Sequence, residues 1–108
     1  MGKTLLALAA VIFSLSPPAA YADARLRTTT CPVEGVAASF KVLGARTEYE
    51  GVAAEYHWLY ANLPEWERTD QALIHVGRRD YDLLYIKHGR QRATICFDIT
   101  DFYGKPAR

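Results

Sequence analysis

Residues 69–99, TDQALIHVGRRDYDLLYIKHGRQRATICFDI, decide the fold of this chain of 108 residues. They contain three strand-like runs, at residues 69–76, 81–88 and 92–99, in which apolar and polar side chains tend to alternate. The connections at residues 77–80 and 89–91 are short and contain glycine, which favours antiparallel hairpins over crossover helices. We therefore predict a three-stranded antiparallel meander.

These connections also predict the register of the meander. If Val76 faces Tyr81 and His88 faces Gln91, one face of the sheet is largely apolar. That face carries Leu73, Leu84, Ile86, Ala93, Ile95, Phe97 and Ile99. The opposite face carries Ala72, Ile74, Val76, Tyr81, Leu83, Tyr85 and Cys96, mixed with Lys87, Arg92, Thr94 and Asp98. A slip of one residue would exchange the two faces.

The pattern before the meander predicts an amphipathic helix over residues 47–63. Thr47 and Glu50 match a capping box, in which both side chains bond backbone donors at the helix start, and Pro64 ends the helix. An apolar stripe recurs at intervals of four, three and four residues, formed by Val52, Tyr56, Leu59 and Leu63. We expect this stripe to pack on the apolar face of the meander.

The segment before the helix predicts a further strand at residues 38–43, where Ala38, Phe40 and Val42 alternate with polar residues. Residues 23–32 are mostly polar and are expected to be a flexible end that is held at Cys31. The fold class that follows is α+β, with one amphipathic helix packed on a three- to four-stranded antiparallel meander and one disulfide.

The first 22 residues have the pattern of a secretory signal peptide. Lys3 supplies the positive end, residues 4–15 are nearly all apolar, and a small-residue cleavage site ends at Ala22. The rival interpretation is a transmembrane anchor, but the apolar stretch is shorter than the roughly 20 residues that span a bilayer. We therefore expect a cleaved signal peptide at residues 1–22 and a single domain at residues 23–108, periplasmic or secreted, without stable membrane insertion.

The charge of the expected mature chain disfavours two classes of partner. Removing residues 1–22 leaves 86 residues, in which twelve basic side chains balance twelve acidic ones because Lys3 is the only charged residue removed. A balanced charge gives no general attraction to phosphate backbones or anionic membranes. We therefore expect no nucleic-acid binding.

Cys31 and Cys96 are the only cysteines in the chain. Export exposes both to an oxidising compartment, so a disulfide between them is the simple interpretation. Closing a loop of this length would stabilise the fold by roughly 4 kcal/mol in the entropic model. A redox-active thiol is the alternative, but the chain has no Cys-x-x-Cys motif.

The residue types that carry most enzyme chemistry are scarce in residues 23–108. Ser39 is the only serine there and lacks a nucleophile-elbow context, and His57, His75 and His88 match no metal-binding spacing. His75 opposite Asp82 across the first hairpin would give an oriented imidazole, but such a pair is also ordinary cross-strand complementarity. We therefore predict no catalytic residues, no metal site and no cofactor.

Two features near the C-terminus have alternative interpretations. Asp98 and Asp101 could serve as an acid and a base, although nothing in the sequence selects them for this role. Phe102 and Tyr103 could dock against the sheet, or they could be exposed anchors for a partner, since aromatic residues dominate interface hot spots.

The mixed face of the meander is the best candidate site. It is too apolar to be bare, and a disulfide to Cys96 would draw the N-terminal segment over part of it. The hypothesis is a non-catalytic protein-binding module, such as an inhibitor, an immunity protein or an envelope accessory protein, whose partner is another envelope or secreted protein. The candidate contact residues are Tyr81, Tyr85, Arg78, Arg79 and Trp66.

A second hypothesis keeps the same fold but places the function inside it. The protein would be a small-ligand carrier or a small enzyme, with a cavity between helix and sheet lined by Tyr56, Leu84 and Phe97. The two hypotheses differ in structure, because the first expects a filled core and an exposed patch.

Overall fold

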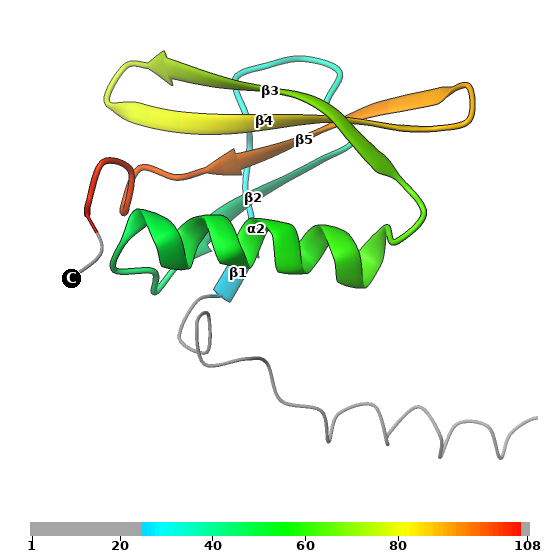
Figure 1. Ribbon diagram of the computed structural model, residues 1–108. Coiled ribbons are helices and arrows are strands. Elements are labelled where there is room, and N and C mark those ends of the chain that lie inside the picture. The colour runs from blue at the N-terminus through cyan, green and yellow to red at the C-terminus, as the bar shows by residue number, and fades with distance from the viewer. Residues whose placement is uncertain (1–24, 107–108) are drawn as a thin grey trace, which may run out of the picture.

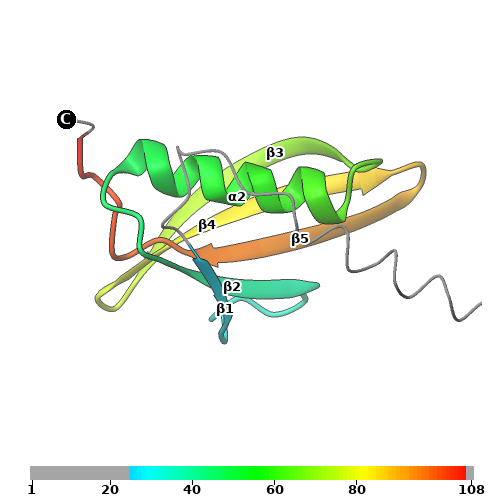
Figure 2. The same ribbon diagram turned by 90° about the horizontal axis from the view of Figure 1, so that it is seen from below.

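The computed structural model describes residues 25–106, and the expected signal peptide at residues 1–22 lies outside them. One helix lies along one face of a five-stranded sheet (Figures 1 and 2). The elements in chain order are β1 (Arg25–Thr28), β2 (Ala38–Leu43), α2 (Glu48–Asn62), β3 (Glu67–Val76), β4 (Arg79–His88) and β5 (Gln91–Asp98). The strand order across the sheet is β1-β2-β5-β4-β3. The α+β class, the antiparallel meander and the strand at residues 38–43 are confirmed.

The sheet differs from the predicted one in size and in direction. β2 pairs with β5 in parallel, with Phe40 opposite Phe97, so the sheet is mixed. The chain leaves β2 through α2 and reaches the far edge at β3, and the meander then returns β5 beside β2 in the same direction. Residues 25–28, expected to be flexible, form β1, because pairing with β2 satisfies their backbone groups.

The two hairpins have two-residue turns, at Gly77-Arg78 and Gly89-Arg90. Each glycine has a positive φ, of 64° and 63°, at the first central position, which is typical of the type II′ turn. The predicted β4–β5 register is confirmed, with His88 opposite Gln91. The predicted β3–β4 register is wrong by two residues, because Val76 faces Arg79 across the shorter turn. An even shift leaves each side chain on its predicted face.

The helix begins and ends where the sequence predicts. Thr47 is the N-cap, and its hydroxyl accepts a hydrogen bond of 3.2 Å from the Glu50 amide. The Glu50 carboxylate accepts from the Arg46 amide at 2.9 Å, one residue before the position that a capping box would use. The C-terminal turn supports the same end of the helix, since the Glu48 amide donates to the Lys105 carbonyl at 2.9 Å.

The main core lies between α2 and the sheet. It consists of Val42, Ala45, Ala54, Leu59, Leu84, Ile86, Ile95, Phe97, Ile99 and Phe102. The buried side of α2 passes through Gly51, Ala54 and Leu59, so the predicted stripe through Val52 and Leu63 is rotated. The cause is the C-terminal turn, which places the Phe102 ring directly against Gly51. Of the two C-terminal aromatics, Phe102 docks in the core and Tyr103 is exposed.

Candidate functional site

The helix-free face, which is the face of the sheet turned away from α2, is partly covered by the β1–β2 connection (cyan in Figure 1). The predicted disulfide between Cys31 and Cys96 is present and ties this connection to β5. A small second core forms beneath it from Tyr81, Leu83 and Cys96, with Val33 and Val36 packed on them. Tyr81, a predicted contact residue, is therefore buried and not accessible to a partner.

Tyr85 lies four residues after Tyr81 on β4, where the cover ends. It is half-buried and lines a hollow of about 330 Å³ on the helix-free face. The hollow extends from the β1–β2 connection across three strands, and its lining residues are Gly35, Thr69, Tyr85, Ile86, Arg92, Ala93 and Thr94. At its β3 wall, the ladder shifts register between Arg68 and Asp70, and the Thr69 hydroxyl donates to the Tyr85 carbonyl at 3.2 Å. A phenol, a guanidinium and threonine hydroxyls therefore share one hollow.

Two cations stand beside this hollow on the same face. Lys87 of β4 is directly opposite Arg92 of β5, and Glu67 of β3 is opposite Lys87 on its other side. Within residues 25–106, neither Lys87 nor Arg92 has an ion-pair partner within 4 Å. Like charges directly opposite each other destabilise a sheet by a fraction of a kcal/mol, roughly 0.2–1. An anion placed between them would remove this repulsion.

The other predicted contact residues lie apart from the hollow. Arg78 is exposed on the β3–β4 turn. Trp66 lies at the other end of β3, directly before its first residue, and its ring packs against the His88 ring with 5.6 Å between the ring centroids. The Nη1 atom of Arg79 contacts Asp98 Oδ2 at 3.0 Å. Only Tyr85 of the five predicted residues lines the hollow. The sequence placed Arg92 and Thr94 on the same face, but it offered no reason to select them.

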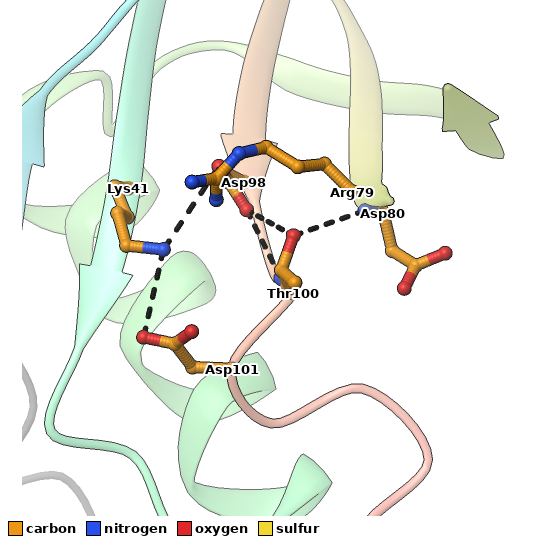
Figure 3. Close-up of polar contacts among 6 residues, drawn as sticks. All are labelled: Lys41, Arg79, Asp80, Asp98, Thr100 and Asp101. Carbon is orange, nitrogen blue, oxygen red and sulfur yellow. Dashed lines mark hydrogen bonds and ion pairs between the residues drawn. The ribbon is translucent and has the colours of Figure 1, made fainter. Parts of the chain in front are cut away.

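A buried carboxylate, Asp98, joins the ends of three strands (Figure 3). Its Oδ1 atom accepts from the amide and hydroxyl of Thr100 at 3.0 and 2.6 Å, while Oδ2 faces Arg79 at 3.0 Å and Lys41 at 4.0 Å. The Thr100 hydroxyl also accepts from the Asp80 amide at 3.0 Å. The cluster consists of Lys41, Arg79, Asp80, Asp98, Thr100 and Asp101.

The charge balance of this cluster indicates a structural role. Burial raises the pKa of Asp98, but the bonds from Thr100 and the charges of Lys41 and Arg79 outweigh it, so the pKa lies below the ordinary value of 3.8. Both carboxylate oxygens are engaged, which leaves Asp98 no capacity as an acid. Asp101 pairs with Lys41 at 3.5 Å and does not contact Asp98 directly.

A second pair of buried carboxyl groups lies between α2 and the sheet, and sequence reasoning missed it. Glu55 is 1% exposed and Asp82 is 3% exposed. Gln71 donates to Asp82 Oδ1 at 2.8 Å, whereas neither oxygen of Glu55 has a hydrogen-bond partner among the described residues. Burial is the larger cause that raises the pKa of Glu55, the neighbouring Asp82 carboxyl raises it in the same direction, and together they bring it to about 11. Glu55 is therefore protonated at neutral pH.

The three side chains expected to line a ligand cavity lie in or at the edge of the core between α2 and the sheet. Leu84 and Phe97, two of the three side chains expected to line a ligand cavity, are fully buried in the core. The third, Tyr56, lies at the edge of the core and lines a crevice of about 140 Å³ at the C-terminal half of α2. The crevice is lined by Tyr56, Leu59, Tyr60, Trp66 and Arg68, and neither Glu55 nor Asp82 opens into it.

His75 was predicted to face Asp82 across the first hairpin, but it faces a different residue. His75 faces Asp80 and not Asp82, because the β3–β4 turn is two residues shorter than expected. Its Nδ1 atom lies 2.6 Å from Asp80 Oδ1, and the His75 side chain is mostly exposed. This is the geometry of a surface cross-strand pair.

In residues 25–106, no helix has the length and apolarity that crossing a bilayer requires. The same residues contain no group of three or more His, Cys, Asp and Glu side chains arranged to hold a metal ion. Comparisons of this chain with protein-family models, with curated proteins and with solved structures found no match.

Proposed function

We propose that the protein is a non-catalytic protein-binding module of the periplasm or the secreted fraction, and that the helix-free face around Tyr85 binds its partner. The observation that carries this proposal is the hollow at Tyr85 beside two cations, Lys87 and Arg92, that have no ion-pair partner within 4 Å among residues 25–106. The expected signal peptide and the disulfide between Cys31 and Cys96 support the compartment.

The hollow favours an acidic side chain of a partner. Arg92 offers a guanidinium that binds carboxylates through two parallel hydrogen bonds, and Lys87 adds a second positive charge opposite it. The Tyr85 ring supplies rigid apolar area, as aromatic hot spots do in other interfaces. A volume of about 330 Å³ accommodates one or two inserted side chains, which is the size of a hot-spot pocket and not of an extended substrate channel.

The rigidity of this face favours binding without a large entropic cost. Tyr85, Lys87 and Arg92 all lie on strands that are hydrogen-bonded in the interior of the sheet. The disulfide holds the β1–β2 connection, which forms one wall through Gly35. Because little has to be ordered on association, more of the contact energy contributes to affinity.

The carboxyl groups support a non-catalytic role. Asp98 has both oxygens engaged in the cluster of Figure 3. Glu55 and Asp82 are buried beneath α2 and have no opening to the hollow at Tyr85. These three buried carboxyl groups therefore supply neither an accessible acid nor an accessible base to the hollow.

Site-specific cross-linking tests the proposal. A photo-reactive phenylalanine analogue is placed at Tyr85 or, as the control, at Tyr60, an exposed tyrosine on α2. The oxidised protein is irradiated in its own envelope extract, and the captured protein is then purified and titrated against the wild type and Tyr85→Ala. We expect one partner captured from position 85, none from position 60, and at least tenfold weaker binding by Tyr85→Ala at unchanged thermal stability. Capture only from position 60, or equal affinity of the two proteins, would refute the proposal.

A further inference from the structure

The free edge of the sheet at β3 is a second surface, independent of the hollow at Tyr85. Among residues 25–106, β3 is the last strand in the sheet order and pairs only with β4. Figure 1 shows β3 at the margin of the sheet, and α2 lies over the strands further in. Two apolar side chains on β3 remain at the surface, Leu73 with 53% and Val76 with 46% exposure.

The β3–β4 register decides which backbone groups face outward. The Asp80 carbonyl accepts from the Ile99 amide at 2.9 Å, so Asp80 bonds toward β5 and His75, its β3 partner, faces away from β4. Outward and inward backbone groups alternate along an antiparallel strand, so those of Leu73 and Gln71 also face outward. The Gln71 amide agrees with this, because it donates to Asp70 Oδ1 at 2.8 Å and not to a strand.

Protection against edge pairing is confined to the first half of β3. Residues 67–70 carry Glu67, Arg68 and Asp70 and contain the register shift. Residues 72–76, ALIHV, contain no acidic residue, lysine, arginine, proline or bulge. Charges, bulges and prolines are the usual protection of an exposed edge, so this half is open to another strand.

We propose that two copies of this chain pair antiparallel through β3, with Ile74 opposite Ile74 of the second copy. This register places Leu73 opposite His75, so the outward groups of both residues form the hydrogen bonds between the copies. On the helix-free face, Ala72 meets Val76 and the two Ile74 side chains meet each other, so all the contacts there are apolar. At each end, Asp70 of one copy lies beside the β3–β4 turn of the other, which carries the exposed Arg78.

The charges distinguish this register from its neighbour. A pairing centred on Leu73 would bring Arg68 beside the turn that carries Arg78, two like charges, and would place Asp70 opposite the apolar Val76. It would also require the Gln71 amide to leave its bond with Asp70. The pairing centred on Ile74 keeps that bond, and it matches opposite charges at both ends because the strand is self-complementary about Ile74.

The proposed pair has a geometric consequence for the hollow at Tyr85. Antiparallel pairing through one edge requires a two-fold axis perpendicular to the sheet. Both helices then lie on one side of a continuous sheet, and both helix-free faces lie on the other. The dimer would present two hollows to the same side, although the pairing itself does not depend on what the hollows bind.

Sedimentation equilibrium of the oxidised protein tests the pairing. Leu73→Pro removes an outward amide but no hydrogen bond to β4. We therefore expect the dissociation constant of the dimer to rise at least tenfold while the fold is retained. Arg78→Asp brings like charges together at each end and should weaken the dimer, and adding Asp70→Arg should restore it. A wild-type chain that is monomeric at millimolar concentration, or a dimer that Leu73→Pro leaves unchanged, would overturn the proposal.

Cysteine cross-linking tests the register separately. Ile74→Cys places two thiols opposite each other across the two-fold axis, where we expect a disulfide-linked dimer to form rapidly in air. Leu73→Cys is the matched control, because in this register it faces His75 and should remain unlinked. Circular dichroism checks that both variants fold. Rapid linkage of Leu73→Cys without linkage of Ile74→Cys would overturn the register.

Discussion

Glu55 makes the stability of the fold depend on pH, and replacing it by glutamine should abolish most of that dependence. The carboxyl group titrates near 4.5 in the unfolded chain, whereas burial raises its pKa to about 11 in the folded protein. Folding therefore takes up a proton at every pH between these values, and the free energy of unfolding falls as pH rises. The slope is about 1.4 kcal/mol per pH unit, which amounts to about 4 kcal/mol between pH 5 and pH 8.

Urea unfolding followed by tryptophan fluorescence at pH 5, 6, 7 and 8 measures this effect. Glu55→Gln keeps the size and polarity of the side chain, so at pH 5 its stability should lie within about 1 kcal/mol of the wild type. At pH 8 the variant should be more stable by a margin approaching the full 4 kcal/mol. Glu34→Gln, in the exposed β1–β2 connection, should leave the wild-type slope unchanged. Parallel stability curves for Glu55→Gln and wild type would refute the reasoning.

Three further substitutions test the contacts that hold the fold. Gly51→Ala improves helix propensity, but its new methyl group meets the Phe102 ring, so calorimetry should show that the free energy of unfolding falls by about 1–3 kcal/mol. An additional Phe102→Leu should recover part of this loss. A single variant that is more stable than the wild type would contradict the packing. Replacing Cys31 and Cys96 by serine should cost roughly 4 kcal/mol in urea unfolding, and an unchanged midpoint would exclude a stabilising disulfide. Asp98→Asn should lower the free energy of unfolding by about 1–3 kcal/mol at pH 7. This difference should vanish as pH falls below 3.8, because a carboxylate whose pKa is lowered by folding stabilises the protein only above that range. A difference that stays constant in acid would contradict the charged network.

Local sequence features correctly predicted the elements that begin or end at capping, proline or glycine residues. Thr47 and Pro64 predicted the limits of α2, and the short connection at Gly89 predicted the β4–β5 register. The connection after Val76 was predicted too long. Arg79 and Asp80 are polar, as turn residues usually are, but they are the first residues of β4. The positive φ available to Gly77 permits a two-residue turn there, and hairpin twist favours that turn over a longer loop.

Long-range features could not be predicted from local patterns. Glu55 is charged in water and lies outside the predicted apolar stripe, yet it is on the buried side of α2 together with Gly51, against which Phe102 packs. Alternation placed Tyr81 and Tyr85 on the same face, as observed. Which of the two is covered depends on the path of the β1–β2 connection, which the disulfide directs over Tyr81.

The central claim is that the hollow at Tyr85 binds a partner through its cations, and a matched pair of charge reversals tests it most directly. Arg92→Glu alters the hollow, whereas Arg90→Glu makes the same change two residues away on the exposed β4–β5 turn. With the partner captured through position 85, titration calorimetry should show at least tenfold weaker binding for Arg92→Glu, about 1.4 kcal/mol or more. Arg90→Glu should bind within about threefold of the wild type, because a charge at the rim contributes little. Equal losses for both variants, or wild-type affinity for Arg92→Glu, would contradict the account.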